Sequence, residues 1–256
     1  MKYNVLSIDW DYFIDCSIAE RHSLFPDGGN ENISLDLSNI IWYTRYSETI
    51  AKKNYGLVAR NIQDISVLED DFDFMKNNIT QNMSYFTVIQ FADSHSAIYN
   101  FLKQYISDDD SLDIYNIDHH CDYYNIGNSL NCGNWINKLD ADNNIDSLTW
   151  IANKDSDLNV DNSSLNCTVS ICTDLKKSLP VDIEWNFIFI CRSSVWSPPH
   201  LDKRFNEFYT LLSNIGVLND DDSKFFIDRY SFMKDAIAKE SNELISFYDR
   251  MYNRKK

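Results

Sequence analysis

Residues 115–122 bring together side chains that can bind a metal ion. They read YNIDHHCD, an apolar run that ends in Asp118, His120 and Asp122. Alternate residues of a strand share one face, so these three side chains can converge just past the strand end. Two carboxylates and one imidazole suit a divalent ion such as Mn²⁺ or Zn²⁺. The alternative interpretation of this motif alone is a polar loop that carries these residues by chance.

Two further apolar runs also end in metal-binding residue types. The first run is VLSIDWDYF at residues 5–13, in which Asp9 and Asp11 share a strand face. Two acids at the end of a buried strand repel each other and are usually held by a cation. In FTVIQFADSHS, which begins at Phe86, the run is followed by His95. Taken alone, the acid pair is also explained by a solvated strand tip, and His95 is also explained as a surface histidine. Three strand ends of this kind in one chain favour a metal site.

The alternation of apolar runs and helical patterns predicts the fold class. Helical spacing is present at residues 96–106, after Ser96 as the cap, and again at 222–256, as one long amphipathic helix or two. Strands alternating with helices indicate an α/β fold, a three-layer αβα arrangement with a central, mostly parallel sheet. Ligands bind beyond the carboxyl ends of such strands, which is where the three motifs lie. The buried strands are expected at residues 3–8, 86–92, 112–117, 147–152, 167–172 and 186–191.

Length and composition limit the domain count and the partners. A chain of 256 residues with 44% hydrophobic residues fits one domain over residues 1–256, with the irregular stretch 20–80 as an insertion or lid near the site. The net charge of −16 argues against nucleic acid and against an anionic membrane surface. It suits a cationic substrate, although a charge that only keeps the protein in solution explains it equally well.

Cysteine usage and hydropathy indicate the compartment. The six cysteines include no C-x-x-C pair and fit a reducing environment better than a disulfide framework. No apolar run approaches the ~20 residues that a membrane helix needs, and the first residues do not resemble a signal peptide. We therefore expect a cytoplasmic protein.

The three motifs together resemble the arginase/deacetylase superfamily. Arginases carry Gly-Gly-Asp-His-Ser, then Asp-Ala-His-x-Asp, then Ser-x-Asp-x-Asp, and the matching pieces here are ADSHS at 92–96, DHHCD at 118–122 and SIDWD at 7–11. The acid pair comes first in this chain and last in arginases. That order, with CGNW at 132–135 and WSPPHLD at 196–202, is similar to an arginase-like family that includes peptide arginases. Those enzymes convert arginine side chains of ribosomally made precursor peptides into ornithine.

The resemblance, which covers residues 1 to about 202, implies a binuclear manganese centre. Two Mn²⁺ ions ~3.5–4 Å apart would activate a water molecule for attack on a guanidinium carbon. Asp122 would pass a proton to the departing amine, which gives ornithine and urea. His119, on the opposite strand face from His120, would support or pack against the centre. The implied ligands are Asp9 and Asp118 as bridges, His95 and Asp122 for one ion, and His120 and Asp11 for the other.

The chain departs from arginases after the metal motif. The arginase Ser-Gly-Asn, which binds the free amino-acid end, corresponds to residues 132–134, and the proton-shuttling histidine two residues later is replaced by Ile136. A missing clamp for the free amino acid fits an arginine that is already part of a peptide. The resemblance and the missing histidine together point to Asn134, Trp196 and Asp202 as substrate contacts and to His200 as a channel residue that shuttles protons.

Several alternatives remain open at this stage. His200 is equally explained as a packing histidine in a rigid loop, since two prolines precede it. Asp155 and Glu184 are further candidates for the carboxylate that grips the guanidinium. The competing functions are a related metal-dependent C–N hydrolase, either a deacetylase or a small-molecule guanidino hydrolase, and a non-catalytic binding protein stabilised by metal. The precursor peptide and the oligomeric state are not predicted.

Overall fold

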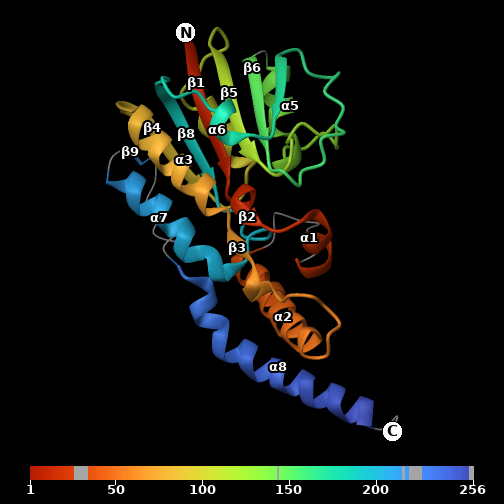
Figure 1. Ribbon diagram of the computed structural model, residues 1–256. Coiled ribbons are helices and arrows are strands. Elements are labelled where there is room, and N and C mark those ends of the chain that lie inside the picture. The colour runs from red at the N-terminus through yellow and green to blue at the C-terminus, as the bar shows by residue number, and fades with distance from the viewer. Residues whose placement is uncertain (26–33, 143, 215–216, 219–226, 254–256) are drawn as a thin grey trace.

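A parallel sheet of seven strands forms the centre of the computed structural model, which describes the chain except for residues 26–33, 143, 215–216, 219–226 and 254–256 (Figure 1). The strand order is β7-β6-β5-β1-β8-β4-β9, and every neighbouring pair is parallel. The six predicted strands are all present, and the predicted α/β fold class is confirmed. The strands are β1 (Lys2–Asp9), β4 (Met83–Ala92), β5 (Ser111–Asp118), β6 (Ile145–Ala152), β7 (Thr168–Cys172), β8 (Trp185–Cys191) and β9 (Val217–Leu218).

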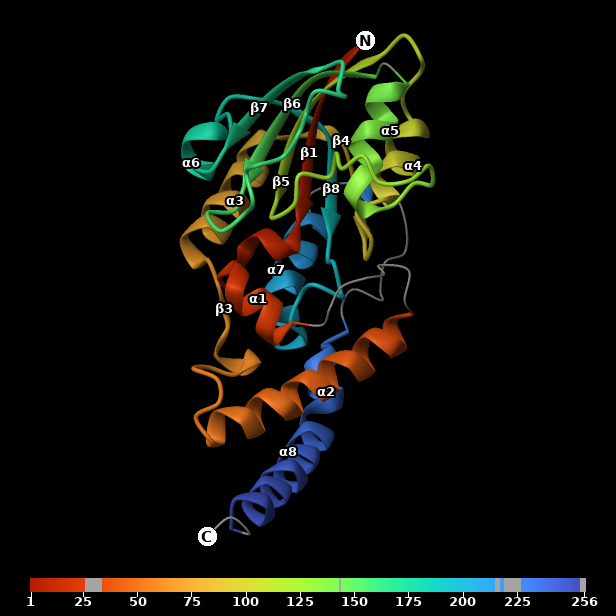
Figure 2. The ribbon, with the colours of Figure 1, turned by 90° about the vertical axis from the view of Figure 1, so that its right-hand side faces the viewer.

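Helices cover both faces of the sheet and make it the middle of three layers (Figure 2). Strand β8 shows how the sequence builds this arrangement, because its alternate residues enter different cores. Ile188 and Ile190 belong to one core, and Phe187 and Phe189 belong to the other. The first core includes residues of α3 (Glu69–Asn82) and α7 (Asp202–Ser213), and the second includes residues of α4 (Ala97–Lys103) and α5 (Trp135–Ala141).

Two long helices extend past the carboxyl edge of the sheet. Helices α2 (Leu35–Asn54) and α8 (Arg229–Asn253) lie against each other beyond the strand ends (Figure 2). Residues 20–80 are therefore not irregular as predicted, because α1 (Ile18–Leu24), α2 and α3 occupy most of them. The helical stripe of α2 is hidden in the sequence because its buried side is partly polar. It buries Ser38, Trp42, Tyr46, Ser47, Thr49 and Ala51. The lid role of this segment stays a prediction.

The C-terminal segment forms one helix, α8, rather than two. It begins at Arg229, and residues 222–226 and 254–256 lie outside the described chain. Its apolar stripe is buried near the start, at Met233 and Ile237, whereas Phe247 near its end is 49% exposed. The stripe is therefore core packing in its first half. None of the described helices is both long enough and apolar enough to cross a membrane.

Shorter elements complete the layers. Helix α4 is shorter than the predicted helix at 96–106, and Tyr105 beyond its end is 41% exposed. The Ser96 hydroxyl meets the Ser94 hydroxyl at 2.7 Å and makes no side-chain cap to the helix backbone. The remaining elements are β2 (Ile14–Asp15) paired with β3 (Ser66–Val67), α6 (Leu175–Ser178), and 3-10 turns at Trp10–Phe13, Ile62–Asp64, Cys132–Asn134 and Pro199–Leu201.

Candidate metal centre

The carboxyl ends of the central strands bring the three sequence motifs to one place. Strand β1 lies between β5 and β8, and the register that pairs Ile8 with Ile117 sets Asp9 beside Asp118 at the ends of two adjacent strands. β4 is the next strand beyond β8, and His95 follows its last residue, Ala92, by three positions. The parallel order of the sheet therefore gathers acids and a histidine from segments far apart in sequence.

His95 stands at the middle of the first group of ligand-type atoms. Its Nδ1 lies 2.8 Å from Oδ2 of Asp122, 3.1 Å from Oδ2 of Asp118 and 3.5 Å from Oδ2 of Asp9. The other ring nitrogen, Nε2, is 2.6 Å from the Ser7 hydroxyl. A hydrogen bond at the far nitrogen fixes the ring so that Nδ1 faces the carboxylates, which is how proteins orient metal-binding histidines.

His120 forms the second group, on the other side of Asp118. Its Nδ1 lies 3.4 Å from Oδ2 of Asp11 and 3.7 Å from Oδ1 of Asp118. The two carboxylate oxygens of Asp118 therefore face the two histidines separately, as a bridging ligand requires. Asp9 lies in the His95 group, and its Oδ1 accepts the N–H of Asp11 at 3.0 Å. A bridging role for Asp9 stays a prediction.

Burial and like charges make this cluster unfavourable on its own. Burial, followed by the charges of Asp11 and Asp118, raises the pKa of Asp9 well above its usual range. Burial and the charge of Asp118 raise the pKa of Asp122 to about 7. Burial lowers the pKa of His95, but the neighbouring carboxylates outweigh it and hold the pKa well above the usual value. A divalent cation relieves the repulsion among the buried carboxylates.

Three unpartnered atoms mark the position where a cation fits. Within the described chain, Asp11 Oδ2, His95 Nδ1 and Asp118 Oδ2 are buried and have no hydrogen-bond partner of good geometry. A buried polar atom left without a partner costs about 1–3 kcal/mol. His95 Nδ1 and Asp118 Oδ2 face each other in the first group, and Asp11 Oδ2 faces His120 Nδ1 in the second. Carboxylate oxygens and imidazole nitrogens form a donor set that suits Mn²⁺ or Zn²⁺, so the residues present fit two divalent ions.

Two strained residues hold the carboxylates in place. Asp122 and Ser193 have φ values of 58° and 49°, and they are the non-glycine residues with positive φ in the described parts of the chain. Such backbone conformations cost about 1–3 kcal/mol each and cluster at functional sites. Ser193 donates its hydroxyl to Asp9 Oδ2 at 2.5 Å, and the Trp135 indole N–H donates to Asp122 Oδ2 at 2.6 Å. Both bonds fix a carboxylate that faces His95.

Arg21 of α1 supports the second group and is missed by the sequence analysis. Its guanidinium Nη1 lies 3.6 Å from Asp11 Oδ2, and its Nη2 donates to the Asp11 carbonyl at 2.7 Å. The side chain is buried, so a positive charge stands beside the His120 group. His119 is also buried, with its ring 5.0 Å from that of His120, and its backbone N–H donates to Asp11.

The supporting roles of Ser7, Trp135 and Ser193 differ in how far the sequence could have revealed them. Ser7 and Trp135 lie inside the SIDWD and CGNW motifs, so a role for them could have been proposed from the motifs alone. Ser193 follows strand β8 with no pattern that separates it from an ordinary loop serine. Only the folded backbone, which turns Ser193 towards Asp9, reveals its contact with the centre.

His200 does not have the contacts expected of a proton shuttle. Its Nδ1 is 2.5 Å from the Tyr46 hydroxyl, and its Nε2 is 2.8 Å from the Ile65 carbonyl. Both ring nitrogens are therefore used to join the 196–202 loop to α2 and to the segment before β3. The packing interpretation of His200 replaces the proton-shuttle prediction, because a shuttle needs a ring nitrogen that can exchange a proton with the substrate or water.

Asp202 and Asn134 are also engaged by the protein itself, which corrects their prediction as substrate contacts. Asp202 accepts from the Arg229 side chain at 2.8 and 2.6 Å, and both residues are buried. Asn134 donates its side-chain amide to the Ile126 and Ser129 carbonyls and accepts the Asn131 N–H, so it closes the loop after the metal motif. These side chains stabilise the loops around the centre.

The other candidate substrate residues lie in different places. Trp196 packs its ring 5.5 Å from the ring of His120, so it flanks the second group, and its substrate contact stays a prediction. Asp155 lies in the loop after β6, at the same edge of the sheet as the centre. Glu184 directly precedes β8 and so lies at the opposite, amino-terminal edge, which corrects its prediction as a guanidinium partner.

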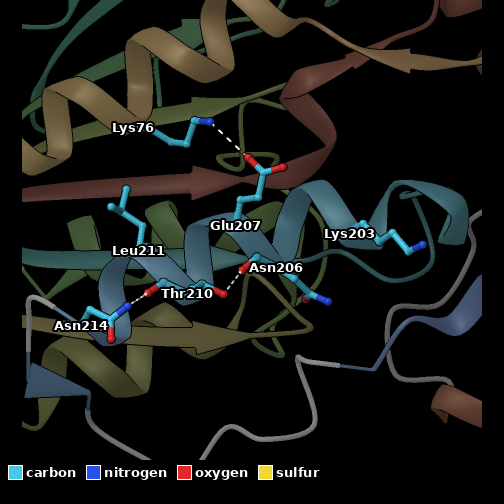
Figure 3. A pocket seen from close by; sticks show the side chains of 7 residues that line it. All are labelled: Lys76, Lys203, Asn206, Glu207, Thr210, Leu211 and Asn214. Atoms are coloured by element: carbon cyan, nitrogen blue, oxygen red, sulfur yellow. Dashed lines mark hydrogen bonds and ion pairs between the residues drawn. The ribbon is translucent and has the colours of Figure 1, made fainter.

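A separate surface groove lies between α3 and α7 (Figure 3). It has a volume of about 560 Å³ and is lined by Lys76, Lys203, Asn206, Glu207, Thr210, Leu211 and Asn214. Lys76 and Glu207 pair across it at 3.2 Å. None of the six ligand-type side chains is among these lining residues, so the groove is not part of the candidate centre.

Comparisons with known proteins add no assignment to this geometry. No protein-family model, curated protein or solved structure matches the chain. The family resemblance therefore stays a prediction. The chemistry of the centre is the basis for a proposed function.

Proposed function

We propose that the protein is a binuclear manganese hydrolase that converts arginine residues of a peptide into ornithine and releases urea. One observation carries the proposal: the two oxygens of Asp118 face His95 and His120 separately, so that one carboxylate is positioned between two groups of ligand-type atoms. A single-ion site has no need for the second group. The donor set is rich in carboxylate oxygens, which favours Mn²⁺ over softer metals.

Six side chains would hold the two ions. His95, Asp9, Asp118 and Asp122 face one position, and Asp11, Asp118 and His120 face the other. When bound, two such ions would lower the pKa of a water molecule and so supply a nucleophile near neutral pH. A guanidinium carbon is a poor electrophile because its positive charge is delocalised, so hydrolysis needs a nucleophile of this strength.

The residues of the chain would bind and orient the substrate. The side chain of His120 is 33% exposed, whereas those of Asp11 and Asp118 are 1% exposed, so substrate reaches the centre on the His120 side. Trp196 flanks this side and is positioned to contact the arginine side chain. Trp135 holds Asp122 through its indole N–H, and we assign to this oriented carboxylate the transfer of a proton to the departing amine.

Two features support a cationic peptide as the substrate. The net charge of −16 attracts cations over a long range. Asn134 is used inside its own loop, so its amide is not free to bind the amino-acid end of free arginine. We infer a ribosomally made precursor peptide as the partner. The six cysteines, all within the described chain, carry free thiols, which supports a cytoplasmic location.

The test is hydrolysis of arginine in two contexts by the Mn²⁺-loaded protein. A peptide that contains arginine is expected to release urea and to lose about 42 Da per modified residue, the mass of the carbon and nitrogen atoms removed with their hydrogens. Free arginine is expected to react much more slowly. Equal or faster turnover of free arginine contradicts the peptide substrate, and removal of acetyl groups from an acetyl-lysine peptide without urea release would assign the centre to a deacetylase. Binding of two ions without any turnover would leave a non-catalytic role.

A further inference from the structure

Two consecutive residues, Ser193 and Ser194, connect the candidate metal centre to the helices beyond the sheet. They follow the last residue of β8 by two and three positions. The Ser193 hydroxyl bonds to the centre, and the Ser194 carbonyl bonds to α2 and α8. Helix α2 lies past the carboxyl edge of the sheet and contains none of the six ligand-type residues (Figure 2). The Ser193–Ser194 segment therefore joins a helix that supplies no ligand to the centre.

On the side of the centre, Ser193 fixes a carboxylate. Its hydroxyl donates to Oδ2 of Asp9 at 2.5 Å, and the same oxygen lies 3.5 Å from Nδ1 of His95. Hydrogen bonds from outside a metal site orient the ligands within it. The direction in which Asp9 presents its oxygens therefore depends on the position of the Ser193 hydroxyl, and so on the backbone of Ser193.

On the side of the helices, the Ser194 carbonyl accepts three hydrogen bonds. Two come from α2, from Trp42 Nε1 at 2.8 Å and from the Ser38 hydroxyl at 3.2 Å. The third comes from Arg229 Nη1, at the start of α8, at 2.8 Å. A carbonyl oxygen has two lone pairs, so these donors use its whole acceptor capacity. All three donor side chains are buried, and such bonds are stronger away from water.

The backbone of Ser193 needs this support because its conformation is unfavourable. A φ of 49° in a serine persists only where the surrounding structure imposes it. The Ser194 hydroxyl donates to Asp93 at 2.5 Å, and the N–H groups of Trp196 and Ser197 donate to the Ser193 carbonyl at 2.8 and 2.9 Å. None of these bonds involves the Ser194 carbonyl. Its direction is set by the donors of α2 and α8.

We propose that Trp42 and Ser38 are positioning residues for the metal centre. They hold the Ser193–Ser194 segment so that Ser193 directs Asp9 towards the ion bound by the His95 group. The inference rests on the proposed function for the two ions, but it concerns metal affinity, which can be measured without turnover. Substitutions along a supporting network of this kind change affinity by roughly 2–30-fold.

The test is titration of the metal-free, full-length protein with Mn²⁺. Trp42→Phe keeps an aromatic ring and removes the indole N–H, so it should weaken Mn²⁺ binding about fivefold. Trp185→Phe makes the same change at another fully buried tryptophan, whose N–H bonds to Asn78 at the amino end of β8. This control should lose stability and keep the Mn²⁺ affinity of the wild type. Arg229 is left unchanged because its substitution would also break the ion pair with Asp202.

A second pair of variants repeats the test with a smaller change of side chain. Ser38→Ala removes the other donor of α2 and should weaken Mn²⁺ binding about twofold. Ser47→Ala is the matched control, because Ser47 is also buried in α2 but donates to the carbonyls of Tyr43 and Ile237. It should bind Mn²⁺ as the wild type does.

A double-mutant cycle tests the route through Ser193. Ser193→Ala removes the bond to Asp9 and should weaken Mn²⁺ binding about tenfold. If Trp42 acts through Ser193, Trp42→Phe should weaken binding by less than about twofold further in the Ser193→Ala protein. A further loss as large as that in the wild-type background would show a different route and overturn the proposal.

The outcomes separate this proposal from the proposed function. Unchanged affinity in Trp42→Phe or Ser38→Ala, or an equal loss in its control, overturns the positioning role of that residue. A wild type that binds two ions but releases no urea from any peptide contradicts the proposed function and leaves the role of α2 standing. A wild type that binds no Mn²⁺ contradicts both.

Discussion

Two regions at the carboxyl edge of the sheet both contain acids and histidines, but these side chains differ in their hydrogen-bond partners. In the metal-centre region, Asp11, His95 and Asp118 each have a buried atom without a hydrogen-bond partner in the described chain. In the 196–202 loop, Asp202 is a buried acid and His200 is a partly buried imidazole, but their polar atoms bond to Arg229, Tyr46 and Ile65. Burial of an acid or histidine alone therefore does not indicate a ligand site, whereas a buried polar atom without a hydrogen-bond partner of good geometry is one indication of it.

The two regions also differ in how charge is balanced. Asp202 and Arg229 neutralise each other at 2.6 Å, and Arg229 also donates to the carbonyls of Ser194 and Ser197. The buried charges of the loop are thus balanced within the described chain. The metal-centre region gathers four carboxylates around two imidazoles, with Arg21 as a nearby cation, and its balance requires further positive charge. This contrast predicts that an Asp→Asn substitution mainly lowers metal binding and activity in the metal-centre region and mainly lowers stability in the 196–202 loop.

Asp118→Asn is expected to have the largest effect on function. It removes the charge from the carboxylate that faces both histidines, so the protein should lose most of its bound Mn²⁺ and at least about 10³-fold in turnover. The metal-free variant should be less stable than the metal-free wild type, because burial is outweighed by His120 and His95, which hold the pKa of Asp118 below its usual range, so its charge stabilises the folded state. Metal analysis, urea release and denaturant unfolding measure the three effects. An active variant with two bound ions contradicts the role of Asp118.

Asp202→Asn is expected to have the largest effect on stability and little effect on chemistry. It leaves the buried Arg229 without its carboxylate, which costs about 3–5 kcal/mol of unfolding free energy. Bound metal per folded molecule should stay at the wild-type level, and kcat in the folded fraction should change less than about twofold. A normal stability combined with a large rise in KM would restore Asp202 as a substrate contact.

Ser7→Ala is expected to have an intermediate effect that is confined to the metal-centre region. The Ser7 hydroxyl holds Nε2 of His95 at 2.6 Å, and loss of such a supporting hydrogen bond costs about 10–100-fold in metal affinity. Titration of the metal-free protein with Mn²⁺ measures the change. Ser23→Ala, at an exposed position in α1, is the matched control and should bind metal as the wild type does. Equal affinity in both variants would show that the His95 ring needs no such support.

His200→Gln is expected to have the smallest effect on catalysis. As a packing residue, His200 should contribute about 1–2 kcal/mol through its hydrogen bonds and nothing to kcat. Burial lowers the pKa of His200 below that of the unfolded chain, so the unfolded state binds the extra proton. Its stabilising effect is therefore lost as the pH falls below the unfolded value of about 6.5, and the substitution removes this pH dependence. A fall in kcat of about 10²-fold, with stability unchanged, would instead support a proton shuttle.

The strands were accessible from the sequence because their signal is local. Strand β8 is apolar on both faces, and the strands β1, β4 and β5 end in conspicuous polar motifs. Helix α2 gives no such signal, since the side it buries includes Ser38, Ser47 and Thr49 as well as aromatic residues. Its burial depends on α8, which lies far away in sequence, so local periodicity could not reveal it.

The candidate site was predictable in its residues but only partly in its geometry. Strand alternation places Asp118, His120 and Asp122 on one face, yet β5 ends at Asp118 and Asp122 has a positive φ of 58°. The side chains converge through a strained loop rather than along a continuous strand. The hydrogen bonds that satisfy His200 and Asp202 come from Tyr46, Ile65 and Arg229, which no spacing rule connects to that loop.

The most direct measurement of the central claim is the anomalous scattering of crystals of the Mn²⁺-loaded protein at the manganese edge. The account predicts two peaks about 3.5–4 Å apart. One should lie against His95 Nδ1 and the other against His120 Nδ1, with the carboxylate of Asp118 between them. A single peak, or peaks that lie away from Asp118, would contradict a binuclear centre at this edge of the sheet.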